Sequence, residues 1–116
     1  PAGHLDWSEP DLVERVDQLI HDLIDTHQAD AVITDDTTAG LLASGLLRQG
    51  RIRVPDDLAI VGHRNDVTVH YTYPRLTTVD IMVSAVMDSA VGMLASPDSL
   101  AKSQVIVPDL IVRDST

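Results

Sequence analysis

The sequence predicts an α/β fold in which helices flank a parallel sheet. One observation leads to this fold class, and two more describe its core. Stretches with helical periodicity alternate along the chain with short apolar runs typical of buried strands. The 116 residues are 44% hydrophobic, so the chain can bury a core. Phe is absent and aromatics make up 3%, so that core must consist of Val, Ile, Leu, Ala and Met.

The first element is an amphipathic helix that ends near His27. Ser8 can cap it, and Pro10 suits its first turn. Apolar side chains then recur at helical spacing, with charged residues between them. The predicted buried stripe consists of Leu12, Val16, Leu19, Ile20, Leu23 and Ile24.

Two short apolar runs then predict neighbouring buried strands. The first covers residues 31–34, and the second covers residues 58–61 and ends at Gly62. A helix from about residue 39 to 49 lies between them, and Gly50 is its expected stop. The order helix, strand, helix, strand favours parallel pairing through right-handed crossovers.

The second half of the chain is less regular. Residues 63–75 carry no clean period and are predicted to form a long loop. Residues 76–79 fit a third strand, after which Asp80 can cap a helix over residues 81–95 that is apolar on most sides. Residues 105–107 and 110–112 predict a final strand pair, or one strand interrupted at Pro108.

Charge and composition argue against several function classes. The net charge is −10, with one Lys and seven Arg, whereas binding to nucleic-acid phosphates needs a basic face. Cys is absent, which removes disulfides and thiolate metal sites and is compatible with the cytoplasm. Five His without a short metal spacing predict no metal site, and no apolar run could span a bilayer. The chain begins at Pro1 and is expected to be part of a longer protein.

Polar side chains follow both of the first two predicted strands. The carboxyl ends of parallel strands share one sheet edge, where ligands bind in open α/β sheets. We therefore expect a ligand site formed by Asp35, Asp36, His63, Arg64 and Asn65. Structural roles remain open for several of these positions: Asp36 or Thr37 could cap a helix, Gly62 could mark a tight strand end, and His63 could be packed or solvated.

Several sequence motifs appear in an order that resembles a known family. Residues 54–62 read VPDDLAIVG, residues 73–79 read YPRLTTV, and residues 107–115 read VPDLIVRDS. Residues 29–39 and 6–8 match the preceding strand and helix entry. Together these motifs resemble the effector-binding domain of bacterial transcription regulators of the lactose and galactose repressor type.

The resemblance implies a type I periplasmic-binding-protein-like fold, in which two subdomains flank an effector cleft. Residues 1–75 would belong to the second subdomain, residues 76–104 would cross into the first, and residues 105–116 would return. The family acts as homodimers and contacts operator DNA through an amino-terminal helix-turn-helix, which this chain lacks. Effector binding in the cleft would alter operator binding.

The same resemblance implies roles for three side chains. Trp7 would stack on a sugar-like face, and Asp35 stands where the family often has Asn. Arg64 stands where the family usually has an Asp that binds sugar hydroxyls. A guanidinium suits phosphate or carboxylate, so we expect a sugar or an anionic sugar derivative. In the alternative, Arg64 pairs internally with Asp35 or Asp36.

Three rival functions are open at this point. The first is a solute-binding protein of a sugar transporter with the same fold. The second is an enzyme that holds Mg²⁺ on Asp35 and Asp36 for phosphoryl transfer, although no nucleophile, phosphate loop or catalytic Lys accompanies that pair. The third is a piece that serves only dimerisation. The regulator-like motifs favour a sensing domain that is not an enzyme and needs no cofactor.

Overall fold

The structure, a computed structural model, describes residues 11–34, 37–50, 52–95 and 103–116. It confirms the predicted α/β class. The elements in chain order are α1 (Leu12–Asp25), β1 (Ala31–Ile33), α2 (Thr37–Leu47), β2 (Ala59–His63), the 3-10 helix η1 (Val67–His70), β3 (Thr77–Asp80), α3 (Val83–Ala95) and β4 (Asp109–Ile111).

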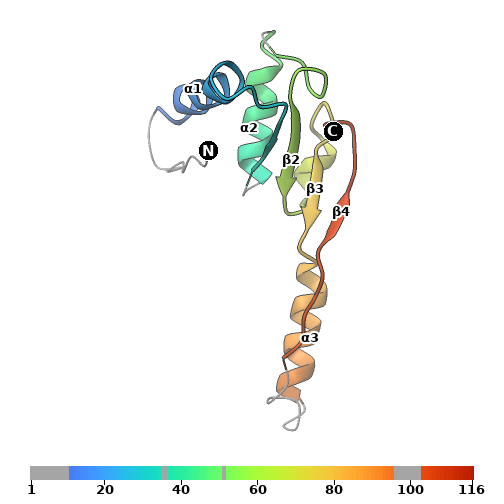
Figure 1. Cartoon of the computed structure of the whole chain (residues 1–116). Coiled ribbons are helices and arrows are strands. Elements are labelled where there is room, and N and C mark those ends of the chain that lie inside the picture. Colours follow the sequence, from blue (N-terminus) through green and yellow to red (C-terminus); the bar gives the residue numbers. More distant parts are fainter. Residues whose placement is uncertain (1–10, 35–36, 51, 96–102) are drawn as a thin grey trace.

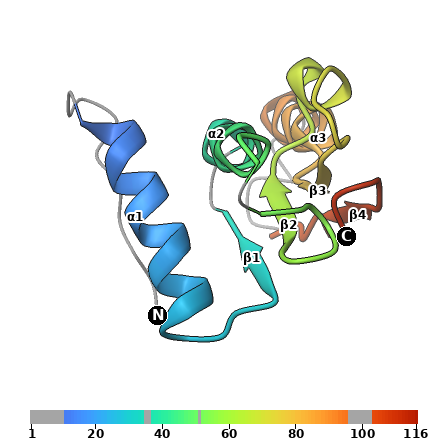
Figure 2. The same ribbon diagram turned by 90° about the horizontal axis from the view of Figure 1, so that it is seen from above.

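The four strands form one sheet in the order β1-β2-β3-β4 (Figures 1 and 2). β1 pairs with β2 and β2 pairs with β3 in parallel, whereas β4 runs antiparallel to β3. The parallel pairing predicted for the first two strands is therefore confirmed. The carboxyl ends of β2 and β3 lie side by side, because His63 pairs with Val79.

The core lies where α1, α2, η1 and the sheet meet. α2 packs against β2, and α1 packs against α2 (Figure 2). The buried cluster is aliphatic, as the composition predicted. It consists of Val16, Ile20, Ala43, Leu47, Leu58, Ile60, Val69 and Leu76.

The first two helices match the periodicity within two residues at their ends. α1 buries Val16 and Ile20 and ends at Asp25 rather than near His27. α2 ends at Leu47, and Gly50 follows with a φ of 102°, the left-handed conformation expected of a stop glycine. The predicted cap at Ser8 lies outside the described residues.

Leu76 packs over a gap left by two glycines. Its side chain is fully buried just before β3. A Cβ placed on Gly62 of β2 would lie 2.7 Å from Leu76 Cδ2, and one on Gly40 of α2 would lie 3.0 Å from the same atom. Gly62 thus allows a close approach by a neighbouring side chain, which links β2, β3 and α2 in one contact.

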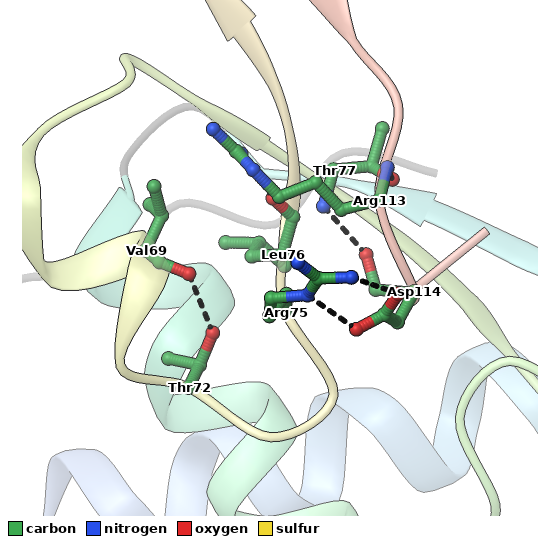
Figure 3. Close-up of polar contacts among 8 residues, drawn as sticks. Val69, Thr72, Arg75, Leu76, Thr77, Arg113 and Asp114 are labelled. Atoms are coloured by element: carbon green, nitrogen blue, oxygen red, sulfur yellow. Dashed lines mark hydrogen bonds and ion pairs between the residues drawn. The ribbon is translucent and has the colours of Figure 1, made fainter.

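The segment after β4 is fastened between β2 and β3 by Ser115. Its buried hydroxyl donates to Ile60 O at 2.6 Å and accepts from Thr77 N at 2.8 Å. Ile60 N also donates to Ser115 O at 2.8 Å. Figure 3 shows Thr77 and its bond to this segment. Ser115 therefore satisfies backbone groups of two strands where they do not pair with each other.

An exposed ion pair fastens the same segment at the surface. Arg75 donates to Asp114 through Nε at 2.7 Å and through Nη2 at 3.0 Å (Figure 3). The bidentate hydrogen bonds of Arg75 lower the pKa of the Asp114 carboxyl below its usual value. The same bonds raise the pKa of Arg75.

Two sequence predictions for the second half need correction. Residues 105–107 are not a strand, because β3 ends at Asp80 opposite Asp109 and offers this stretch no partner. The last helix begins at Val83 rather than residue 81, since Met82 has a left-handed φ of 55°. Within the predicted loop 63–75, η1 forms a short helical turn.

α3 extends away from the sheet beyond the end of β3 (Figure 1). None of its residues is buried. The chain after residue 102 runs back beside it toward β4, and Ser89 of α3 bonds Gln104 through their side chains at 2.5 Å. The exposed apolar side chains of α3 are Val83, Val86, Met87, Val91 and Leu94.

We predict that Gly62→Ala destabilises the chain by about 1–3 kcal/mol, because the new methyl would overlap Leu76. Gly45→Ala in α2 is the matched control, because a Cβ at this position would meet no neighbouring atom within 4 Å. Alanine is the better helix former, so this substitution should stabilise the chain by about 0.5–1 kcal/mol. Urea denaturation followed by circular dichroism measures both changes. Equal effects of the two substitutions would contradict the packing described for Leu76.

Candidate functional site at the carboxyl ends of β2 and β3

A pocket of about 420 Å³ lies where β2 and β3 end. One wall follows β2, and the other contains the end of β3 and the first turn of α3. Its lining residues are Arg64, Asn65, Asp66, Asp80, Ile81, Met82, Val83, Ser84 and Ala85. The pocket therefore occupies the sheet edge at which ligands bind in open α/β folds.

The structure brings together part of the predicted site. Arg64 and Asn65 line the pocket, whereas His63, half-buried at the end of β2, does not. The predicted residues Trp7, Asp35 and Asp36 lie outside the described residues.

Sequence reasoning missed the second wall of the pocket. Asp80 ends β3, so the rule that placed Arg64 at a strand end applies equally to it. The sequence pattern predicts only a helix cap at Asp80. The sequence does not predict the turn from Asp80 to Val83, because its apolar side chains also fit the helix predicted over residues 81–95.

The backbone at Arg64 is held in an uncommon conformation. Its φ is 69°, in the left-handed region that non-glycine residues seldom adopt. Arg64 N donates to Val79 O at 2.9 Å, which continues the pairing of β2 with β3 by one bond. This bond fixes the start of the loop that forms the first wall.

Asn65 connects the two walls directly. Its Nδ2 donates to Asp80 Oδ2 at 3.1 Å. The other carboxylate oxygen of Asp80 accepts from Met82 N at 2.8 Å. Asp80 therefore holds the turn into α3 while it bonds the loop after β2.

Asp66 is committed to the loop that it begins. Its Oδ1 accepts from Thr68 N at 3.0 Å and from the Thr68 hydroxyl, so it caps η1. The pocket thus combines one guanidinium, one amide and two hydrogen-bonded carboxylates with the apolar side chains of Ile81, Met82 and Val83. Such a mixture of donors, acceptors and apolar surface suits a small hydroxyl-rich molecule.

Among the described residues, no three His, Asp or Glu side chains are grouped so that they could hold a metal ion. Within those residues, no helix is both long and apolar enough to cross a bilayer.

A family model described as the periplasmic binding protein-like domain matches residues 2–116. The match covers nearly the whole chain, so the chain belongs to the periplasmic binding protein-like domain family. The fold expected from the regulator resemblance is thereby confirmed.

Several proteins similar to this chain are transcription regulators. The HTH-type transcriptional regulator MalR of Streptomyces coelicolor is 35% identical over 103 residues, covering 76% of this chain and 29% of the regulator. The Escherichia coli transcriptional repressor ascG has a TM-score of 0.76 at 22% identity, covering 98% of this chain and 41% of that one. A LacI family regulator from Arthrobacter sp. FB24, in complex with lactose, has a TM-score of 0.72 at 22% identity, covering 90% and 42%.

The chain corresponds to only part of each of these proteins. It spans between 24% and 32% of the length of the curated relatives that it matches. The structural likeness, at this sequence identity, shows a shared fold.

We predict that Arg64→Gly is more stable than Arg64→Ala by about 1 kcal/mol, because glycine adopts a left-handed φ without the steric cost that a Cβ imposes. Both variants remove the guanidinium, so their difference isolates the backbone. Thermal unfolding of the two proteins side by side measures it. An Arg64→Ala variant at least as stable as Arg64→Gly would contradict the conformation.

Proposed function

We propose that this chain is the carboxyl-terminal part of the effector-binding domain of a bacterial transcription regulator. The pocket at the carboxyl ends of β2 and β3 carries the proposal, because it places polar side chains at the ligand edge of a periplasmic-binding-protein-like fold. The relatives named as transcriptional regulators favour a sensor over a transport protein. The protein would work in the cytoplasm.

The proposed effector is a sugar or an anionic sugar derivative. Arg64 and Asn65 can donate to ligand oxygens, and the two carboxylates can accept from hydroxyls. Trp7, Asp35 and Asp36 are proposed to complete the site, with Trp7 stacking on the sugar face. Lactose in the Arthrobacter neighbour is consistent with this class of ligand.

Arg64 favours an effector with a negatively charged group. Its guanidinium presents a donor fork that matches phosphate or carboxylate, and it lines the pocket opposite the start of α3. Backbone N–H groups at a helix start also favour an anion. The alternative is an internal pair of Arg64 with Asp35 or Asp36, which would leave a neutral sugar as the better ligand.

The exposed helix α3 fits the proposed two-subdomain architecture. Residues 76–104 are proposed to cross into the first subdomain, which would cover the apolar side chains of α3. Because β3 pairs with β2, residues 77–80 still belong to the same sheet as β1 and β2, and the proposed crossing would begin after Asp80. Residues 105–116 would then return to the second subdomain.

In the complete protein, effector binding is proposed to change DNA binding in a homodimer. The effector would bind two subdomain arrangements with different affinity, which couples the pocket to a helix-turn-helix outside this chain. The chain is proposed to have no catalytic role and no cofactor. A phosphoryl-transfer enzyme using Asp35 and Asp36 would instead show a Mg²⁺-dependent activity.

In the full-length protein we expect glucose 6-phosphate to bind more tightly than lactose, with an affinity that falls as salt rises. Arg64→Gly should weaken the phosphate ester about tenfold or more, since a charge-assisted bond is lost. Calorimetric titrations measure both ligands, and operator gel shifts test the link to DNA. If lactose binds more tightly than glucose 6-phosphate and Arg64→Gly leaves its affinity unchanged, the proposal of an anionic effector is wrong. If the full-length protein does not bind DNA, the proposal that it is a transcription regulator is wrong.

We expect the isolated 116-residue chain to self-associate, because α3 exposes apolar side chains along its whole length. Light scattering over a range of concentrations measures the mass in solution. Val91→Glu and Leu94→Glu together should reduce association, whereas Ser84→Glu on the same helix should not. A monodisperse monomer at high concentration would contradict this expectation.

A further inference from the structure

Arg113 lies behind the pocket and is not among its lining residues. Its half-buried guanidinium donates three hydrogen bonds to neutral acceptors. Nη1 reaches Leu76 O at 2.5 Å and Thr78 Oγ1 at 3.0 Å, and Nη2 reaches Asn65 Oδ1 at 2.6 Å. Figure 3 shows Arg113 on the final segment beside Leu76 and Thr77. A side chain two residues beyond β4 thus holds a residue of the pocket wall.

The bond from Arg113 determines which way round the Asn65 amide lies. A guanidinium can only donate, and an ionised carboxylate can only accept. The amide oxygen of Asn65 must therefore face Arg113, and its Nδ2 must face Asp80. Because the guanidinium is charged, it polarises the amide and strengthens the bond to Asp80.

Asp80 connects the oriented Asn65 amide to the start of α3. One carboxylate oxygen accepts from Asn65, and the other accepts from Met82 N. Met82 has a left-handed φ of 55°, and the helix begins at the next residue. The orientation of the Asp80 carboxylate therefore sets the turn that forms the second wall of the pocket.

We infer that Arg113 is a positioning residue for the pocket, acting through a relay of Arg113, Asn65, Asp80 and the Met82 amide. Through this relay Arg113 ties the segment after β4 to both pocket walls without itself lining the pocket. Its effect on an effector rests on the proposed function, but its effect on Met82 does not.

The opposing view is that Arg113 only fastens the final segment to β3. That segment has other attachments, namely the Arg75–Asp114 ion pair and the bonds of Ser115. Asn65→Asp separates the two views, because it keeps the shape of the side chain and gives Arg113 a stronger acceptor. It removes the donor to Asp80 and places two carboxylates side by side. The substitution therefore breaks the relay while it strengthens the bond between Arg113 and residue 65.

The direct test is hydrogen exchange of the Met82 amide, followed by NMR in the full-length protein. We expect Asn65→Asp to speed this exchange roughly tenfold, since Asp80 loses the bond that holds its carboxylate. Arg113→Met should also speed exchange of the Met82 amide. Arg113→Lys should speed it as well, because one ammonium cannot reproduce the hydrogen bonds of the guanidinium fork. Arg75→Met is the control, because it breaks the ion pair that attaches the final segment just before β3, and it should leave Met82 exchange unchanged.

Unchanged exchange at Met82 in Asn65→Asp, with a folded spectrum, would overturn the relay even if Arg113→Met unfolds the protein. An equal response to Arg75→Met would also overturn it, because any loosening of the final segment would then suffice. In a second measurement, Arg113→Met, which changes no residue that lines the pocket, should weaken whichever of lactose and glucose 6-phosphate binds, and Arg75→Met should not. If neither probe binds the unmodified protein, the proposed effector class fails while Met82 exchange still decides the relay.

Discussion

The side chain of Leu76 lies against the bare backbone of Gly62, and the geometry of the sheet depends on this contact. The same Leu76 atom would also meet a Cβ on Gly40, so α2 can approach β2 and β3 together. With the two strands held in register, their carboxyl ends lie side by side and the loops that follow them can form a pocket. A larger residue at either glycine would separate the layers and the pocket walls with them.

The sequence predicted the parts of the fold that local pattern determines. The stripe containing Val16 and Ile20 predicted α1, and the apolar runs around Val32 and Ile60 predicted neighbouring parallel strands. The end of the sheet was not predictable in this way, because residues 105–107 are as apolar as a strand and fail to pair only for lack of a partner. Strand pairing is a tertiary property, and the β pattern alone cannot report it.

The residues of the candidate site likewise fall into those that local sequence predicts and those that depend on tertiary contacts. Arg64 and Asn65 were found because they directly follow a recognisable strand, and both line the pocket. The contributions of Asp80 and Arg113 depend on contacts across 15 and 48 residues of chain, which no local period encodes. The regulator resemblance supplied the family and therefore the expected cleft. It gave no indication of how the final segment reaches the pocket wall.

The bond from Ser115 to Ile60 spans 55 residues of chain, and this separation has a consequence for the order of folding. During synthesis α1, β1, α2 and β2 emerge well before residue 115, so they can pack on one another while the edge of β2 still lacks this partner. Closing so long a loop costs conformational entropy that only the finished sheet can offset. A nascent chain halted before residue 115 would therefore expose the open strand edge beside Ile60, which is a template for pairing with other chains.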